Sequence, residues 1–221
     1  MPRDRPPAVH ALLRVSDLDA LVWEARRPDW ARTQLQHAPW VVVRRSAHRS
    51  GLWPVGVRGA LRAQRCAAWL PDRAVDDRVT PQLLASRRAW RQHWGNEAHP
   101  PIVVLEEVAL ILAAHGHDGR WGPCGSVGFE LATGLPCTTR DSDLDLVLQA
   151  ERPMAREDAA RLHADLTKLA VRIDLLLEMP HGAVALSEYA TVGDMMLLRS
   201  AQGPRLVRDP WTAGRVGASG A

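Results

Sequence analysis

The amino-acid sequence predicts an α+β protein built from two modules. Short runs rich in Val, Leu and Ile, typical of strands, alternate with segments whose apolar residues recur at helical spacing. A polar stretch between roughly residues 80 and 100, ending in Pro100-Pro101, separates a basic half from an acidic half. We therefore expect a smaller, basic α+β module over residues 1–90 and a second α+β domain over residues 91–221.

The two halves carry opposite net charge. Residues 1–100 hold 17 Arg and 9 acidic residues, whereas residues 101–221 hold 11 basic and 16 acidic residues. A basic module can attract a phosphorylated ligand, an acidic protein or nucleic acid. A well-solvated arginine-rich surface explains the same charge, so this observation alone leaves the partner open.

Composition argues against a membrane protein and against a disulfide-stabilised one. With 46% hydrophobic and 24% charged residues, the chain has the balance of a soluble globular protein. No apolar run approaches the ~18 residues of a membrane span, and the first residues lack the apolar segment of a signal peptide. Cys66, Cys124 and Cys137 are odd in number and far apart, which argues against a disulfide framework or a zinc site. We expect a cytoplasmic protein without a membrane partner.

The first module is expected to contain both helices and strands. Residues 17–25 and 29–38 have helical patterns, each with an Asp near its start. The short β-branched run 39–45 and the run 52–59, which has glycines at bends, are expected to be strands. Residues 59–71 have apolar side chains at helical spacing and are expected to form a helix that stops at a proline.

The second domain has the clearer pattern of alternating helices and strands. Its expected elements are a helix (103–116), a turn-rich segment (117–126), a short helix or strand (127–134), a strand (143–150), an amphipathic helix (155–170), a strand (171–178) and three final elements (182–190, 195–200, 204–211). Gly116 is placed to end the first of these helices. His115 and His117 flank that glycine and are better explained by the helix end than as ligands, and Glu188 is better explained as a buried structural acid.

Two like charges stand one residue apart in Ser142-Asp143-Leu144-Asp145-Leu146. Alternate side chains of a strand share a face, so Asp143 and Asp145 are expected to point the same way. Two adjacent carboxylates repel, and a proton or a cation must relieve that repulsion. Mg²⁺ suits such a pair, because it prefers a few carboxylate oxygens together with substrate phosphates. A solvated strand edge is the plain alternative for an isolated Asp-x-Asp.

A third acid, Asp174, lies within the next apolar strand. A carboxylate is costly to bury there unless it is paired or bound to a metal. If the two strands are neighbours, Asp174 can face the same site as the first pair. An ion pair with Arg172 or Arg140 would explain it equally well.

Gly125-Ser126 lies 17 residues before Asp143. A Gly-Ser turn that leads into a helix offers backbone N–H groups and a hydroxyl to a phosphate. Together with metal-binding carboxylates, such a turn makes a site for phosphoryl or nucleotidyl transfer.

In this order the motifs resemble the DNA polymerase β-like nucleotidyltransferase superfamily: a helix over 102–115, Gly-Ser, Asp-x-Asp and a later Asp. The resemblance implies a mixed sheet with flanking helices in the C-terminal half, which would be the catalytic domain. It also implies Mg²⁺ or Mn²⁺ bound by Asp143, Asp145 and Asp174, with Asp174 helping to deprotonate the incoming hydroxyl. The gap between Gly-Ser and Asp-x-Asp is longer here than in that superfamily, which indicates an insertion.

A wider set of segments is similar to one family within that superfamily. The segments are "VVVRR", "PVGVRGALRAQRCAAWL", "GSVGFELATGLP", "SDLDLVL", "GAVALSEYA" and "DPW". They resemble the holo-acyl-carrier-protein synthases of malonate decarboxylase, which are phosphoribosyl-dephospho-CoA transferases. The resemblance implies transfer of the prosthetic group from 2′-(5″-triphosphoribosyl)-3′-dephospho-CoA to a serine of the apo acyl carrier protein of malonate decarboxylase, with release of pyrophosphate.

The same resemblance suggests which residues bind the substrates. Gly125 and Ser126 would hold the triphosphate, and Arg58, Arg62 and Arg65 would contact phosphate or the carrier protein. Arg62 and Arg65 are three residues apart and would share a helix face, although a solvated helix face explains that pair equally well.

Two other functions stay open from the sequence alone. One is a nucleotidyltransferase that uses an ordinary nucleoside triphosphate on a small molecule, RNA or protein. The other is a non-catalytic basic binding module, against which the three acids weigh. A nucleic-acid partner is not expected, because the chain has neither an aromatic RNP motif nor a Gly-x-x-Gly loop in the right context.

Overall fold

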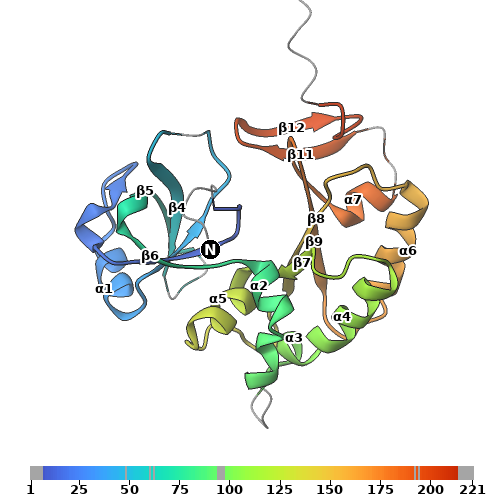
Figure 1. Ribbon diagram of the computed structural model, residues 1–221, viewed down its shortest axis with the longest axis horizontal. Coiled ribbons are helices and arrows are strands. Elements are labelled where there is room, and N and C mark those ends of the chain that lie inside the picture. Colours follow the sequence, from blue (N-terminus) through green and yellow to red (C-terminus); the bar gives the residue numbers. More distant parts are fainter. Residues whose placement is uncertain are drawn as a thin grey trace, which may run out of the picture.

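The computed structural model describes residues 7–47, 49–59, 61, 63–93, 98–191, 193 and 195–213. Within these residues the chain forms two six-stranded sheets, each with its own hydrophobic core (Figure 1). Helices flank both sheets, so the α+β prediction is confirmed. In the part of the chain that the structure describes, no helix has the length and apolar character needed to cross a membrane.

The N-terminal sheet has the strand order β2-β5-β4-β3-β1-β6, and each pair of neighbours is antiparallel. Its strands are β1 (Leu12–Val15), β2 (Val22–Trp23), β3 (Trp40–Val43), β4 (Leu52–Arg58), β5 (Arg65–Pro71) and β6 (Val75–Val79). Helix α1 (Asp29–His37) buries Ala31 and Leu35 in the core of this sheet, and the short 3-10 turns η1 (Leu18–Ala20) and η2 (Asp72–Ala74) complete the module. The helix predicted over 29–38 and the strands predicted over 39–45 and 52–59 are confirmed.

Two helices predicted for this module are wrong. Residues 17–25 form only η1 followed by β2, and residues 65–71 form β5 instead of the end of a helix. All seven residues of β5 pair with β4, from Arg58 opposite Arg65 to Leu52 opposite Pro71. The alanine-rich pattern of this segment favours a helix locally, but the complete backbone pairing with β4 outweighs that weak preference.

The C-terminal sheet has the order β12-β11-β10-β9-β8-β7 and is mixed. Its strands are β7 (Trp121–Pro123), β8 (Leu144–Gln149), β9 (Ile173–Met179), β10 (Gly182–Ala185), β11 (Met196–Ser200) and β12 (Gly203–Val207). Strands β8 and β9 are parallel, and the other neighbouring pairs are antiparallel. Helix α6 (Arg156–Leu166) makes the long connection that two parallel strands require.

The remaining helices pack around this second sheet (Figure 1). They are α2 (Pro81–Ser86), η3 (Ala89–His93), α3 (Pro100–Val103), α4 (Leu105–Ala114), α5 (Gly125–Thr133) and α7 (Leu186–Thr191). Leu84, Ala85 and Trp90 lie in the core of the C-terminal sheet, whereas Ala74 lies in the N-terminal core. The chain therefore passes from one core to the other before Leu84.

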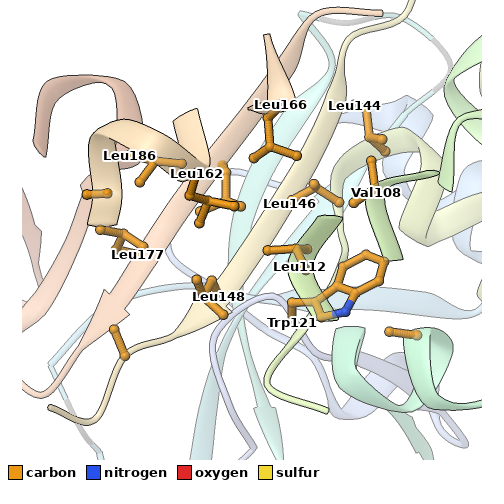
Figure 2. Close-up of a cluster of buried hydrophobic side chains, with 14 of the residues drawn as sticks. Val108, Leu112, Trp121, Leu144, Leu146, Leu148, Leu162, Leu166, Leu177 and Leu186 are labelled. Carbon is orange, nitrogen blue, oxygen red and sulfur yellow. The ribbon is translucent and has the colours of Figure 1, made fainter. Parts of the chain in front are cut away.

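The core fixes which way the side chains of β8 point. Leu144, Leu146 and Leu148 are fully buried between the sheet and helices α4 and α6 (Figure 2). Burial of each such leucine contributes roughly 1.5–3 kcal/mol. A one-residue slip in register would expose all three, so the register is strongly specified. Asp145 consequently points to the opposite face of the sheet.

Candidate active site

The Gly-Ser turn and the Asp-x-Asp motif lie in direct contact. Cys124 precedes α5 and donates its backbone N–H to the carbonyl oxygen of Asp145 (2.9 Å). Gly125, the first residue of α5, has φ +60°. A Cβ atom at this position would lie 1.9 Å from Asp145 Oδ2. Only glycine allows this backbone conformation together with such a close carboxylate.

Ser126 follows within the first turn of α5 and is only 8% exposed. Its backbone carbonyl accepts a hydrogen bond from Cys137 Sγ (3.1 Å). The turn predicted to hold phosphate is therefore at the start of a nine-residue helix, where free backbone N–H groups favour anions. The assignment of Gly125 and Ser126 to phosphate binding stays a prediction.

Asp145 and Asp174 stand opposite each other in the parallel ladder between β8 and β9. Asp174 is 47% exposed, so the expectation that it is a buried acid is wrong. Its Oδ1 lies 3.5 Å from Nε of Arg172, the ion pair considered as an alternative from the sequence. Its position at the upstream end of β9 leaves the carboxylate in solvent rather than in the leucine core. Its role as metal ligand or base stays a prediction.

The acids influence one another electrostatically. Burial raises the pKa of Asp145, and the negative charges of Asp174 and Asp143 raise it further. Arg58 and His10 act in the opposite direction and lower the pKa of Asp145. A carboxylate with a raised pKa, beside two like charges, is the arrangement that a cation relieves.

Whether the carboxylates of this site can hold a metal ion depends on the other ligands of that metal. Within the described ranges, no group of three or more His, Cys, Asp or Glu side chains is arranged to hold a metal ion. Mg²⁺ commonly binds through one or two carboxylates together with substrate phosphates. Asp143 and Asp145, in the motif beside the turn predicted to bind phosphate, would fit a metal of that kind, because substrate phosphates would complete its ligands.

The three arginines predicted to bind substrate have different positions. Arg58 ends β4, is partly buried and acts electrostatically on Asp145 and on Cys137. Arg65 begins β5, pairs in register with Arg58 and is exposed. Arg62 lies outside the described residues. The expectation that Arg65 lies on a helix face is wrong, because that residue belongs to a strand.

A group centred on Glu178 was missed from the sequence. Glu178 lies on β9 four residues after Asp174, on the same face of the strand, and is only 8% exposed. Its Oε1 accepts a hydrogen bond from Arg45 Nη2 (2.5 Å) and lies 3.2 Å from Nε2 of His10. Burial would raise the pKa of Glu178, but its contacts with His10 and Arg45 together outweigh burial and lower it. The one signal of this acid in the sequence is its even spacing from Asp174 along the strand. Its partners Arg45 and His10 lie in the other module, so the sequence pattern did not reveal them.

A second missed acid, Glu130, shapes the loop that leads to Asp143. Its Oε2 accepts hydrogen bonds from the backbone N–H groups of Cys137 (2.9 Å) and Thr138 (2.7 Å). Glu130 lies on α5. This helix therefore begins with the Gly-Ser turn and, through Glu130, also binds the backbone of the loop that leads to Asp143. Glu188, by contrast, accepts the N–H of Leu197 (2.9 Å), which fits the structural role expected for it.

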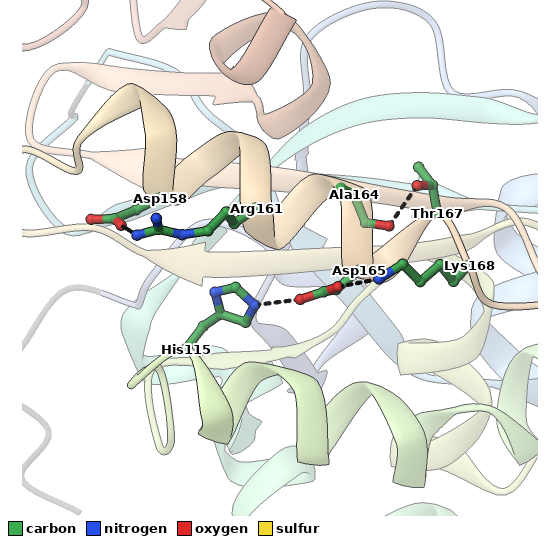
Figure 3. Close-up of polar contacts among 7 residues, drawn as sticks. All are labelled: His115, Asp158, Arg161, Ala164, Asp165, Thr167 and Lys168. Carbon is green, nitrogen blue, oxygen red and sulfur yellow. Dashed lines mark hydrogen bonds and ion pairs between the residues drawn. The ribbon is translucent and has the colours of Figure 1, made fainter.

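The histidines that flank Gly116 contact other residues than the acids of the candidate site. His115 Nε2 is 2.8 Å from Asp165 Oδ2, which links the end of α4 to α6 (Figure 3). A cavity of about 550 Å³ adjoins them at the downstream end of β8, beside Gln149 and Ala150. The described residues that line this cavity include none of the predicted site residues.

Comparison with protein families covers both modules. The family model described as the phosphoribosyl-dephospho-CoA transferase MdcG N-terminal domain matches residues 8–81. The model of the MdcG C-terminal domain matches residues 88–210. The chain belongs to the phosphoribosyl-dephospho-CoA transferase family.

Curated relatives within this transferase family span nearly the whole chain. A phosphoribosyl-dephospho-CoA transferase of Azotobacter vinelandii is 39% identical over 93% of this chain and 94% of its own length. Proteins of the same description from Pseudomonas putida and from Klebsiella pneumoniae strain 342 are 40% and 36% identical, each over 93% of this chain and over 95% and 96% of their own lengths. No solved structure matches the chain significantly.

Proposed function

We propose that the protein transfers the phosphoribosyl-dephospho-CoA group from 2′-(5″-triphosphoribosyl)-3′-dephospho-CoA to a serine of the apo acyl carrier protein of malonate decarboxylase. Membership of the transferase family supports the reaction class. The observation that carries the proposal is the contact between Gly125 and Asp145, with Asp174 opposite in the sheet. This contact supports the proposal because it brings the turn predicted to bind phosphate next to the carboxylate of Asp145.

In this reaction the serine oxygen attacks the phosphorus nearest the ribose. A new O–P bond forms, the bond to the outgoing pyrophosphate breaks, and the hydroxyl proton passes to a base. Negative charge develops on the phosphate oxygens, so positioning and electrostatic stabilisation are the main tasks of the protein. A bound Mg²⁺ or Mn²⁺ would neutralise part of that charge.

Five of the predicted site residues have a task in this scheme. The carboxylates of Asp143 and Asp145 would hold the metal, and the backbone at Gly125 would receive a phosphate. Asp174, which is exposed and therefore accessible to the carrier protein, accepts the proton of the serine hydroxyl. Arg58 offers a fixed positive charge beside Asp145.

The proposal is tested by weighing the carrier protein after reaction. Apo carrier protein, Mg²⁺ and the enzyme are incubated with either triphosphoribosyl-dephospho-CoA or ATP, and the carrier is analysed by intact mass spectrometry. We expect the mass of the phosphoribosyl-dephospho-CoA group with the first donor and no change with ATP. A carrier carrying a nucleotide from ATP would instead identify an ordinary nucleotidyltransferase, and an unmodified carrier in both reactions would contradict the proposal.

A further inference from the structure

A buried carboxylate fastens the two sheets together next to the candidate site. Glu178 belongs to β9 of the C-terminal sheet, and its hydrogen-bond donor Arg45 is 133 residues away in the chain, directly after β3. Arg45 is 18% exposed and Glu178 is 8% exposed. A charge this well buried needs its partners, since removing them would leave it unpaired in a poorly solvated place.

His10, the second partner of Glu178, is held in an unusual backbone conformation. Its φ is +70°, which is uncommon for a residue other than glycine. Its backbone N–H donates to the carbonyl oxygen of Val43 (3.0 Å), the last residue of β3, and its ring nitrogen Nε2 lies 3.2 Å from Oε1 of Glu178. Strained residues of this kind persist where the surrounding contacts determine them, and they are concentrated at functional sites.

The group lies beside the acids of the candidate site. Glu178 and Asp174 share one face of β9, and Asp174 is the register partner of Asp145. From the N-terminal sheet, His10 and Arg58 both act electrostatically on Asp145. Strand β4, which carries Arg58, pairs with β3, after which Arg45 follows. The contact made by Glu178 therefore ties the sheet that carries Arg58 to the C-terminal sheet.

We propose that Glu178 is a positioning residue of the transferase, which through Arg45 and His10 holds the N-terminal module, with Arg58, beside Asp145. The active site is then completed by both modules and not by the C-terminal sheet alone. This inference rests on the proposed function. The competing explanation is an ion pair that only stabilises the fold. A buried pair of that kind can be replaced without loss of stability when both charges are removed together.

The test compares Glu178→Gln with a matched control in the intact protein. Glu178→Gln keeps the size of the side chain and removes its charge. We expect kcat/KM for carrier modification to fall by about 10²-fold per folded molecule, because a misplacement of about 1 Å in a catalytic site has that effect. The folded fraction is measured by circular dichroism and thermal melting. Glu106→Gln is the control, because Glu106 also accepts hydrogen bonds from two arginines, Arg88 and Arg91.

Variants of Arg45 make the test independent of how well Glu178→Gln folds. Arg45→Lys keeps the positive charge and should retain more activity than Arg45→Met. The double variant Arg45→Met/Glu178→Gln should be no less active and no less thermostable than Glu178→Gln alone, because both changes remove the same contact.

The outcomes distinguish a failure of the proposed function from a failure of the positioning role of Glu178. If the wild-type protein leaves the carrier unmodified, the proposed function fails and this inference fails with it. If the wild type is active and Glu178→Gln has the same activity per folded molecule, only the positioning role is overturned. The same conclusion follows if Glu106→Gln loses as much activity as Glu178→Gln, or if the effects of Arg45→Met and Glu178→Gln are additive.

Discussion

The carboxylate of Asp145 occupies the space in which a side chain at position 125 would begin. A Cβ atom on Gly125 would lie 1.9 Å from Oδ2 of Asp145, and the φ of Gly125 is +60°. The Gly-Ser turn and the Asp-x-Asp motif can therefore lie this close together only with a glycine at position 125.

Replacing Gly125 by alanine should abolish that contact. We expect a loss of about 1–2 kcal/mol in the free energy of unfolding from the left-handed backbone, and a loss of carrier modification of at least about 10²-fold because Asp145 is displaced. Denaturant melts and the mass-spectrometric assay measure the two effects. Gly134→Ala is the control: Gly134 has φ +72° but no atom within 4 Å of its added Cβ, so stability should fall while activity per folded molecule is kept. Equal loss of activity in both variants would argue against a special role for position 125.

The carboxylates of Asp143 and Asp145 should both be needed for transfer. Asp143→Asn and Asp145→Asn are each expected to lower transfer by at least about 10²-fold, because each removes a charged group that holds the metal in the proposed reaction. Transfer within a few-fold of wild type in both variants would remove the pair from the site.

The pH dependence of stability gives a separate test of Asp145. Its folded-state pKa is raised, so the folded protein binds that proton more tightly than the unfolded chain does. The ionised carboxylate consequently destabilises the fold above its folded pKa. In metal-free buffer, Asp145→Asn should melt at a higher temperature than the wild type near pH 7. The difference should disappear as the pH falls below about 3.9, the pKa of an unperturbed Asp. A lower melting temperature for the variant at pH 7 would contradict the raised pKa.

Asp174 should be nearly neutral for stability and important for activity. Its ion pair with Arg172 joins two exposed side chains, 47% and 72% exposed. Such pairs contribute about 0–1 kcal/mol, so Asp174→Ala should lower the free energy of unfolding by less than about 1 kcal/mol. We expect transfer to be lost. If Asp174 also contributes to the metal site, as the family resemblance implies, the rise in melting temperature caused by Mg²⁺ should be smaller than in the wild type, because a ligand that binds only the folded state stabilises it. A variant with a full response to Mg²⁺ and full activity would show Asp174 to be a surface acid only.

Arg58 should act on the anionic donor through its charge. Arg58→Ala is expected to raise the KM for triphosphoribosyl-dephospho-CoA, and the effect should shrink only in part as salt is added, since partly buried charges are screened less than exposed ones. Arg65→Ala serves as the comparison, because Arg65 pairs in register with Arg58 but is exposed. Steady-state kinetics at low and high salt measure both. An unchanged KM for Arg58→Ala at low salt would limit Arg58 to a structural role.

The local sequence pattern was enough to predict the central strand of the second domain. The alternation of leucine and aspartate in residues 143–148 correctly predicted a strand whose leucines are buried and whose Asp145 faces away. The helix ends were also readable: α4 closes at Gly116, where the N–H of His117 bonds back to the carbonyl oxygen of Leu112 (2.8 Å). In both cases the information lies within a few residues, because side-chain period and helix capping are properties of the local backbone.

The sequence by itself thus determined that this protein is α+β, which residues form the leucine core of β8, and which family it belongs to. Only the tertiary structure decided that residues 65–71 are a strand, that Asp174 is exposed and that Glu178 joins Arg45 and His10. The physical reason is that periodicity specifies which face of an element is buried, but not which distant segment covers it. The strand partner of residues 65–71 and the ion-pair partners of Glu178 are chosen by packing between elements far apart in the chain.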